Sequence, residues 1–409
     1  MEKLYLYFSI PDVKFLERET FQNLKELYLG AKDISSLENL NFAKLEKLRI
    51  SSNDINVLES VNFPNLKELY LGVGKTGISV LEKVKFENLE ILDISSYKNI
   101  LDMNILEKVN FKKLKYLKVN CSIPDLKFLE KVKFDNLLKL ILYDILTTNI
   151  SGIEKATFKE LKEIRLGSFI YNCGFSQKIF DDLSPLSEVK FKHLEILYLN
   201  KISNCNFLEK LDFKDLKELS IRDISDIKIL EKVKFEKLEK IYLGSHISDL
   251  TILEKVNFKG LKELNLSCNE ISYINILEKV KFEKLEILNL TGNKISEINI
   301  LEKVNFKELR KLFLSQNIIS NISVLEKIKF GKLEELILDH NKIIDINVLE
   351  KVNLKQLKKL SIAYNKINDI KVLEKISNNA FKHIYLYNNE FDNLKYNYLK
   401  TKFHGKLHF

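Results

Sequence analysis

The chain has 409 residues, and its 45% of hydrophobic residues is enough to build a sizeable core. Lys and Arg outnumber Asp and Glu by 66 to 57, and this excess of +9 is spread along the whole sequence, which argues against a dedicated nucleic-acid or membrane surface. The four cysteines lie far apart with no CxxC or paired spacing, and no apolar run approaches the roughly 18 residues of a membrane span.

The first expected element is a strand in MEKLYLYFSIPDV, residues 1–13. Its short apolar run does not indicate a signal peptide, because an acidic residue comes early and no small-residue cleavage site follows. The cysteines are therefore expected to be reduced, and the chain is expected to be intracellular and cytoplasmic.

The same pattern recurs from this strand to about residue 390. With the first Leu of an LxxLxL stretch as position 1, 17 units begin at Met1, Leu24, Leu45, Leu66, Leu89, Leu114, Leu137, Leu161, Leu194, Leu216, Leu238, Leu261, Leu285, Leu309, Leu333, Leu357 and Phe381. The spacing is 24 residues from Leu261 onward, and it varies more among the earlier units. Such repetition predicts one elongated solenoid, because each unit contacts mainly its neighbours.

Each unit contains hydrophobic residues at two different spacings. Positions 4 and 6 alternate with polar residues, which is the period of a strand, and positions 14, 17 and 20 recur every third residue, which is typical of a tight helical turn. One unit cannot bury its apolar face alone, so neighbouring strands must pair. The predicted fold is an α/β solenoid, an arc with a long parallel concave sheet of 17 strands and short helical or irregular convex returns.

Two further positions are expected to be structural. Asparagine recurs at position 9, just after the strand, where a side-chain amide can both donate to and accept from the backbone groups that a turn leaves unpaired. These residues are Asn53, Asn269, Asn293, Asn317, Asn341, Asn365 and Asn389. Phenylalanine recurs at position 22 and predicts a stacked aromatic spine inside the convex side.

The pattern LxxLxLxxNxIxxIxxL resembles the leucine-rich repeat and covers nearly the whole chain. Its NxISxIxxL continuation resembles the short repeats of protein phosphatase regulators and of bacterial internalins. The 24-residue unit, the regular LEKVxF segment and the missing asparagines midway depart from those groups. The resemblance implies an arc whose concave strands bind another macromolecule, commonly a protein, without naming it.

The concave face is expected to carry the side chains of positions 3, 5, 7 and 8. Aromatic residues recur there, and either they form an interface, where Tyr is over-represented, or they merely suit a half-exposed strand. The residues expected to bind a partner are Phe313, His340, Tyr364, His383, Tyr385, Tyr387, Tyr242, Tyr198, Tyr70 and Tyr28. The first six of these are the preferred contact surface. A second group, Tyr5, Tyr7, Phe8 and Tyr28, is interpreted as partly a cap.

Charged residues at position 2 alternate in sign from one unit to the next, as in Glu286, Arg310 and Glu334, with an interruption between Lys115 and Glu195. In a parallel sheet this places opposite charges side by side. The return columns that contain Glu278 and Lys303 are expected to offset each other in the same way. The ladders therefore specify register and leave little field for recruiting DNA or RNA.

One insertion interrupts the series between Leu161 and Leu194, with SFIYNCGFSQKIFDDLSPL at residues 168–186. Two interpretations are open, a functional loop and a tolerated insertion, since a solenoid accommodates loop length at little free-energy cost.

No catalytic constellation is visible among the six histidines, and HExxH, GxSxG, P-loop and GxGxxG motifs are absent. His404 and His408 could share a helical face as metal ligands, but Gly405 weakens that helix and further ligands are missing. We therefore predict no catalytic, cofactor-binding or metal residues, no cofactor, and no enzyme activity.

The two ends differ. The first strand begins essentially at Met1 with no visible cap, so this edge is expected either to self-associate or to continue into a longer protein. The tail at 391–409 departs from the repeat and is expected to fold over the last strand. The predicted domains are a solenoid at 1–390 and a capping tail at 391–409.

The function expected from these features is a non-enzymatic scaffold that binds a protein partner on the concave surface, without a membrane. An alternative is a regulatory subunit of an enzyme such as a protein phosphatase. A nucleic-acid-associated protein is the least expected reading.

Overall fold

The computed structural model describes residues 1–17, 21–40, 42–74, 77–85, 87–109, 112–147, 149–167, 180, 182–202, 204–224, 227–352, 356–376, 382–392, 394 and 396–408, with the side chains of all of these except 8, 9 and 97–99. The chain forms two compact units, Met1–Asp212 and Phe213–Phe409. Within the described ranges, no helix has the length and apolar character needed to cross a membrane.

The first unit alternates strands with 3₁₀ helices. Its strands are β1 (Lys3–Ile10), β2 (Glu26–Ala31), β3 (Lys47–Ser52), β4 (Glu68–Val73), β5 (Ile91–Ile100), β6 (Tyr116–Ile123), β7 (Lys139–Ile145), β8 (Glu163–Gly167) and β9 (Ile196–Leu199). Its described 3₁₀ helices are η1 (Lys14–Glu17), η3 (Ser35–Asn39), η4 (Asn56–Glu59), η5 (Ser79–Glu82), η6 (Met103–Lys108), η7 (Lys127–Glu130), η8 (Ile153–Lys155), η9 (Ser184–Glu188) and η10 (Asn206–Lys210).

The second unit repeats this alternation with mostly shorter strands. They are β10 (Glu218–Arg222), β11 (Lys240–Gly244), β12 (Glu263–Asn265), β13 (Ile287–Asn289), β14 (Lys311–Phe313), β15 (Glu335–Ile337), β16 (Lys359–Ser361), β17 (His383–Tyr385) and β18 (Leu407–His408). The described helices are η11 (Lys228–Glu231), η12 (Thr251–Glu254), η13 (Asn275–Glu278), η14 (Asn299–Glu302), η15 (Ser323–Glu326), η16 (Asn347–Glu350), η17 (Lys371–Glu374) and the α-helix α1 (Asn397–Lys402).

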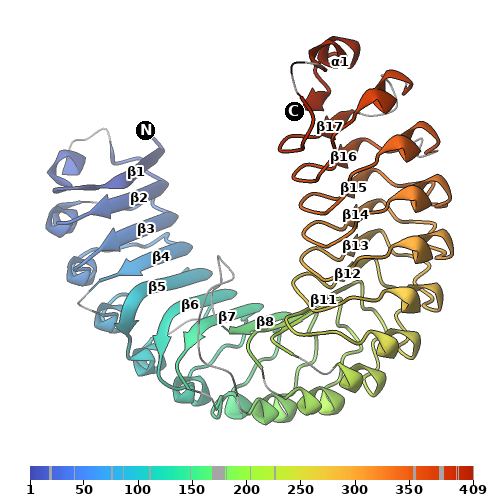
Figure 1. Ribbon diagram of the computed structural model, residues 1–409. Helices are drawn as coiled ribbons and strands as arrows, with labels where there is room; N and C mark the ends of the chain where they lie inside the picture. Colours follow the sequence, from blue (N-terminus) through green and yellow to red (C-terminus); the bar gives the residue numbers. More distant parts are fainter. Residues whose placement is uncertain are drawn as a thin grey trace. The chain divides into compact units, whose positions relative to one another are not determined.

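The predicted solenoid repeat is confirmed in each unit. Consecutive strands pair in parallel with equivalent repeat positions opposite one another, as where Leu264 faces Leu288 and Leu288 faces Leu312. The strands lie on one side of each unit and the 3₁₀ helices on the other (Figure 1). The leucines of positions 4 and 6 point between these two layers, and Leu264 and Leu266 are fully buried. We call the side of the sheet that faces away from the 3₁₀ helices the strand face.

The asparagine ladder is confirmed in the second unit. Asn317 is 6% exposed, and its Nδ2 donates to the carbonyl oxygens of Leu290 and Leu314 at 3.0 Å each. Its Oδ1 accepts from the backbone nitrogen of Ile295 in the preceding repeat at 3.0 Å. The same set of bonds recurs from Asn269 to Asn389, so each amide joins two adjacent turns.

Position 8 corrects one expectation. It was predicted to lie on the strand face in every repeat, but Ala31, Val73 and Cys121 are at most 5% exposed, because their strands continue through this position with unbroken alternation. In the second unit the position 8 residues instead have φ between 54° and 70°, and His340 and Tyr364 are exposed as predicted. A left-handed residue there turns the chain, so that the asparagine after it points inward.

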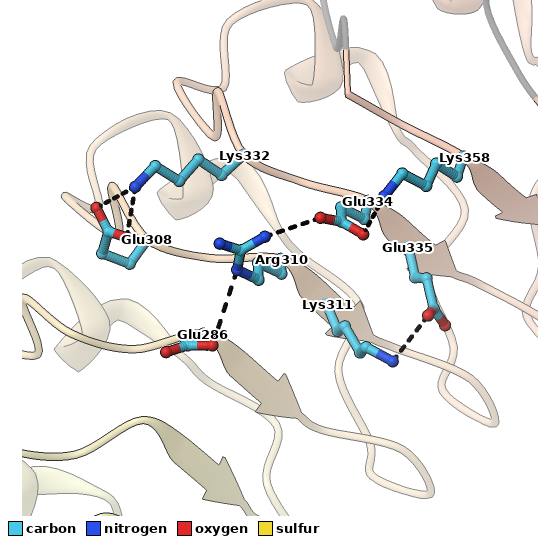
Figure 2. Close-up of polar contacts among 8 residues, drawn as sticks. All are labelled: Glu286, Glu308, Arg310, Lys311, Lys332, Glu334, Glu335 and Lys358. Atoms are coloured by element: carbon cyan, nitrogen blue, oxygen red, sulfur yellow. Dashed lines mark hydrogen bonds and ion pairs between the residues drawn. The ribbon is translucent and has the colours of Figure 1, made fainter.

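Other predicted columns are also confirmed. Neighbouring position 22 rings stack, as in the pair Phe282 and Phe306, whose centroids lie 6.5 Å apart. Arg310 lies between two carboxylates, 3.7 Å from Glu286 and 2.8 Å from Glu334, and Lys358 contacts Glu334 from the other side at 2.6 Å (Figure 2). On the return side, Lys327 pairs with Glu302 at 3.4 Å.

The C-terminal tail adds a strand to the sheet. β18 pairs in parallel with β17, and Tyr385 lies opposite His408. Two backbone bonds hold it, from Ile384 N to Lys406 O at 2.8 Å and from Leu386 N to His408 O at 2.7 Å. Leu399 and Phe403, on and just after α1, are fully buried. The tail thus supplies core residues as well as an edge strand.

Candidate binding surface

Two of the predicted residues, His340 and Tyr364, stack on each other. They occupy position 8 of consecutive repeats, where both have φ of 54°, and this conformation projects their side chains outward. Their ring centroids are 4.1 Å apart with the planes 12° from parallel. Because a bulky residue rarely adopts a left-handed conformation, Tyr364 is a strained choice for a turn. It is also 43% exposed.

Further rings extend this stack. Tyr387 meets Tyr364 edge-on with centroids 5.6 Å apart, and it meets Tyr385 edge-on at 6.3 Å. Tyr385 in turn stacks on His408 at 4.5 Å and lies 6.0 Å from His383. We call these six residues, His340, Tyr364, His383, Tyr385, Tyr387 and His408, the C-terminal aromatic cluster.

Polar groups lie beside the C-terminal aromatic cluster. The Asp339 carboxylate accepts from Ser361 Oγ at 2.6 Å and from the backbone nitrogen of Ala363 at 2.8 Å, which ties two repeats together. Burial, followed by the nearby Asp339 carboxylate, raises the pKa of Tyr387. The Lys359 Nζ lies 5.3 Å from the ring centroid of Tyr385, within cation–π range.

Two predicted residues of the second unit lie apart from these ring contacts. Phe313 on β14 is half-buried, and its register partners on the adjoining strands are Asn289 and Ile337. Tyr242 on β11 is also half-buried, opposite Ser220 and Asn265. Both face the same side of the sheet as Tyr385, because all three occupy position 5.

The first unit carries a separate tyrosine group at its N-terminal edge. Tyr5 lies 4.6 Å from Tyr28 and 6.0 Å from Tyr7, measured between ring centroids. The Tyr5 hydroxyl donates to the Glu26 carboxylate at 2.7 Å. The side chain of Phe8, which was predicted to join this group, lies outside the described residues.

The remaining predicted tyrosines lie beside cations. Lys47 Nζ is 5.9 Å from the ring of Tyr28 and 5.2 Å from that of Tyr70. The Tyr70 hydroxyl donates to Glu68 at 2.9 Å, and burial together with this carboxylate raises the pKa of Tyr70 to about 12. Tyr198 on β9 has the guanidinium carbon of Arg165 5.4 Å from its ring.

Sequence reasoning missed some of these participants. Lys47 and Arg165 were not predicted as site residues, although positions 3 and 5 were both placed on the strand face, and that placement was the signal that could have found them. His408 was missed for a different reason. It lies outside the repeat pattern, and only its pairing with β17 brings it to Tyr385.

Among the parts of the chain that the structure describes, no group of three or more His, Cys, Asp or Glu side chains is placed to hold a metal ion. Most of the 168–186 insertion, including Cys173, lies outside those parts.

Comparisons with known proteins found a matching family profile and similar solved structures. A family profile described as Leucine Rich repeat matches residues 261–273. A search of curated proteins found no match. Among solved structures, the Leptospira interrogans LRR protein LIC12759 is 18% identical with a TM-score of 0.53, covering 92% of this chain and 96% of that one. A chain of the TLR13–ssRNA13 complex is 17% identical with a TM-score of 0.56, and the match spans 96% of this chain but 55% of that one.

A third solved structure is the internalin InlF from Listeria monocytogenes str. 4b F2365, which is 22% identical. It has a TM-score of 0.40, with 92% of this chain and 85% of that one covered. At these identities the likeness to solved structures concerns the fold alone.

Proposed function

Because this chain is a leucine-rich-repeat protein, we propose that it is a non-enzymatic scaffold whose strand face binds another protein. The anchor of this contact is the C-terminal aromatic cluster. The observation that carries the proposal is the pair His340 and Tyr364, which stack 4.1 Å apart on exposed left-handed turns.

This pair has no evident role in folding. At the same position, glycine stands at Gly292, two repeats before His340, with φ of 70°, and asparagine stands at Asn388, one repeat after Tyr364. These are the residues that this backbone favours. A tyrosine in that conformation costs about 1–3 kcal/mol relative to unstrained backbone. Exposed tyrosines are enriched among the residues that dominate protein interfaces. A binding role accounts for a tyrosine at a position where folding favours glycine.

The charge distribution supports a protein partner over a nucleic acid. A polyanion needs cations free to neutralise phosphates. Here Arg310 and Lys358 share Glu334, and Lys311 contacts Glu335 at 2.8 Å (Figure 2). The TLR13 chain similar to this fold was solved with a single-stranded RNA, so RNA binding is the competing outcome that the experiment must separate.

The test is affinity capture from cell extract with the full chain and three variants. Tyr364→Asn removes the ring and leaves a residue that suits the left-handed turn, and Tyr385→Ala with Tyr387→Ala removes the neighbouring rings. Both are expected to weaken the captured complex at least about tenfold, the effect typical of a hot-spot aromatic. Tyr273→Ala is the matched control, because this tyrosine is 80% exposed but lies beyond the turn, away from the strand face.

The outcomes are distinct. Proteins retained by the wild type and by Tyr273→Ala but lost from the cluster variants support the proposal. A retained phosphatase favours the regulatory-subunit alternative. RNA or DNA whose binding falls steeply with salt would replace the protein partner. Capture that is unchanged in both cluster variants removes the cluster as the anchor.

The edge of β1 supports a smaller proposal, that a second copy of the chain covers it. Leu4 and Leu6 are only half-buried, whereas their equivalents Leu27 and Leu29 are at most 3% exposed. Light scattering of the 409-residue chain is expected to show dimers if a second copy covers this edge. A strict monomer whose β1 amides exchange slowly would contradict this proposal.

A further inference from the structure

The last two strands bring together two histidines that are 25 residues apart. His383 begins β17 and His408 ends β18, and their nitrogens Nδ1 and Nε2 lie 3.2 Å apart. The ring centroids are separated by 5.4 Å, with the planes inclined by 32°. Without a metal ion, such a pair shares one hydrogen bond, in which one imidazole donates and the other accepts.

The same separation fits two ligands of one metal ion. Zinc binds imidazole nitrogen at about 2.0–2.1 Å, and in tetrahedral geometry two such nitrogens lie about 3.3–3.4 Å apart. The observed 3.2 Å between Nδ1 and Nε2 needs only a small adjustment. We propose that His383 and His408 form a two-histidine site for a divalent ion that prefers imidazole, such as Zn²⁺, with water in the remaining positions.

The surroundings favour this arrangement. His383 is exposed, so an ion can reach it from solvent. The Tyr385 ring stacks on His408 at 4.5 Å and 12°, which fixes the orientation of that imidazole.

The site would also fasten the tail. β18 is held to β17 by the backbone bonds to Ile384 and Leu386, and an ion shared by the two strands adds a side-chain link across the same edge. Sequence spacing had suggested His404 as the companion of His408. The structure instead places His408 against His383, with His404 exposed on the turn after α1. An ion that binds folded but not unfolded chain stabilises the fold.

The experiment is calorimetric titration of the full, tag-free chain with ZnCl₂, without any partner. One ion is expected per chain, saturating in the low-micromolar range, and zinc is expected to raise the thermal midpoint until EDTA is added. His383→Gln is expected to weaken zinc binding more than about tenfold, because it removes a direct ligand. His404→Gln and His340→Gln are matched controls that keep both ligands and are expected to bind zinc like the wild type.

His383 is the better position to substitute because its side chain is exposed, while His408 is half-buried under Tyr385. A circular dichroism spectrum confirms that each variant is folded. Zinc affinity that is unchanged in His383→Gln overturns the proposal, as does the lack of saturable binding in wild type. A stoichiometry of one ion per two chains also overturns it, because the ion would then join different molecules. These readouts need no protein partner, so they are independent of the scaffold proposal.

Discussion

The early repeats with strands β2–β6 and the late repeats with strands β12–β17 complete the same turn by different means. The early strands are six to ten residues long, and they bury position 8 through Ala31, Val73 and Cys121. The late strands are three residues long and end before a left-handed residue that sends an asparagine inward.

The early and late repeats satisfy the backbone hydrogen-bonding groups that follow the strand in different ways. In the early repeats the ladder continues past the strand through the main chain, as from Gly74 N to Ser52 O at 3.1 Å. In the late repeats the side chains of residues such as Asn317 take over. The late design leaves position 8 free for a functional side chain, and it is here that His340 and Tyr364 lie. The early design uses the same position for the core.

The test with the largest expected effect places a carboxylate at position 8 in each region. Val73→Asp buries an unpaired charge where the native side chain is 5% exposed, so it is expected to lower the free energy of unfolding by about 4 kcal/mol or more. Gln316→Asp is exposed and suits a left-handed turn, so its effect is expected to stay within about 0.5 kcal/mol. Urea unfolding measures both, and similar losses would contradict the comparison.

A second test removes the turn bonds themselves. Asn317→Ala leaves three carbonyl oxygens and one backbone N–H without this partner and is expected to lower the free energy of unfolding by about 2–4 kcal/mol. Its counterpart, Ser96→Ala, loses one bond, from Oγ to the Val73 carbonyl oxygen at 2.9 Å, and is expected to lose about 1 kcal/mol. Equal destabilisation in urea would show that the asparagine ladder is not specific to the late design.

Glycine at position 8 is expected to have opposite effects in the two regions. Ala31→Gly removes a buried methyl group and adds backbone freedom to the unfolded chain, so about 1 kcal/mol of stability is lost. Gln316→Gly relieves the left-handed conformation at φ of 54°, and this gain outweighs the added chain entropy by about 0.5 kcal/mol. Shifts of opposite sign in the unfolding midpoint would support the difference between the two regions, and two shifts of the same sign would contradict it.

The smallest expected effect concerns a feature that both regions share. Glu46→Lys places like charges beside Lys67, and Glu334→Lys does so beside Arg310 and Lys358. Both reversals are expected to lower the thermal midpoint slightly, because these ion pairs are partly exposed, and high salt should reduce the loss. The neutral variants Glu46→Gln and Glu334→Gln are controls expected to lie between. A lowering of the thermal midpoint that does not change with salt would show that the charged residues at position 2 have another role.

Much of the fold follows from the sequence, because periodicity alone separates strand from return. Leu264 and Leu266 alternate with polar residues, and the threefold spacing from Ile274 to Leu277 anticipates η13. The conformation of position 8 could not be predicted from the asparagine that follows it. Ser52 precedes Asn53 and yet is buried within β3, in register with Val73 of the neighbouring long strand. The neighbouring repeats decide this conformation, and a single unit does not contain that information.

The candidate surface was predictable to the extent that it follows the repeat. His340, Tyr364, Tyr385 and Tyr387 come together because their positions recur on adjacent strands. His408 does not belong to the repeat, and no periodic argument could place it against His383. The cations beside Tyr70 and Tyr198 needed side-chain geometry, since a long side chain at position 3 or 5 can extend toward either neighbouring strand.

Between Glu195 and Lys358, the alternating signs at position 2 give the surface a translational period of two repeats. Arg310 is flanked by Glu286 and Glu334, so deleting one repeat would bring carboxylate against carboxylate or cation against cation. Removing or duplicating two repeats together preserves every opposite-charge neighbour. A chain of this kind can therefore be lengthened or shortened most easily in even steps, which also gives the increment for engineering solenoids of other lengths from it.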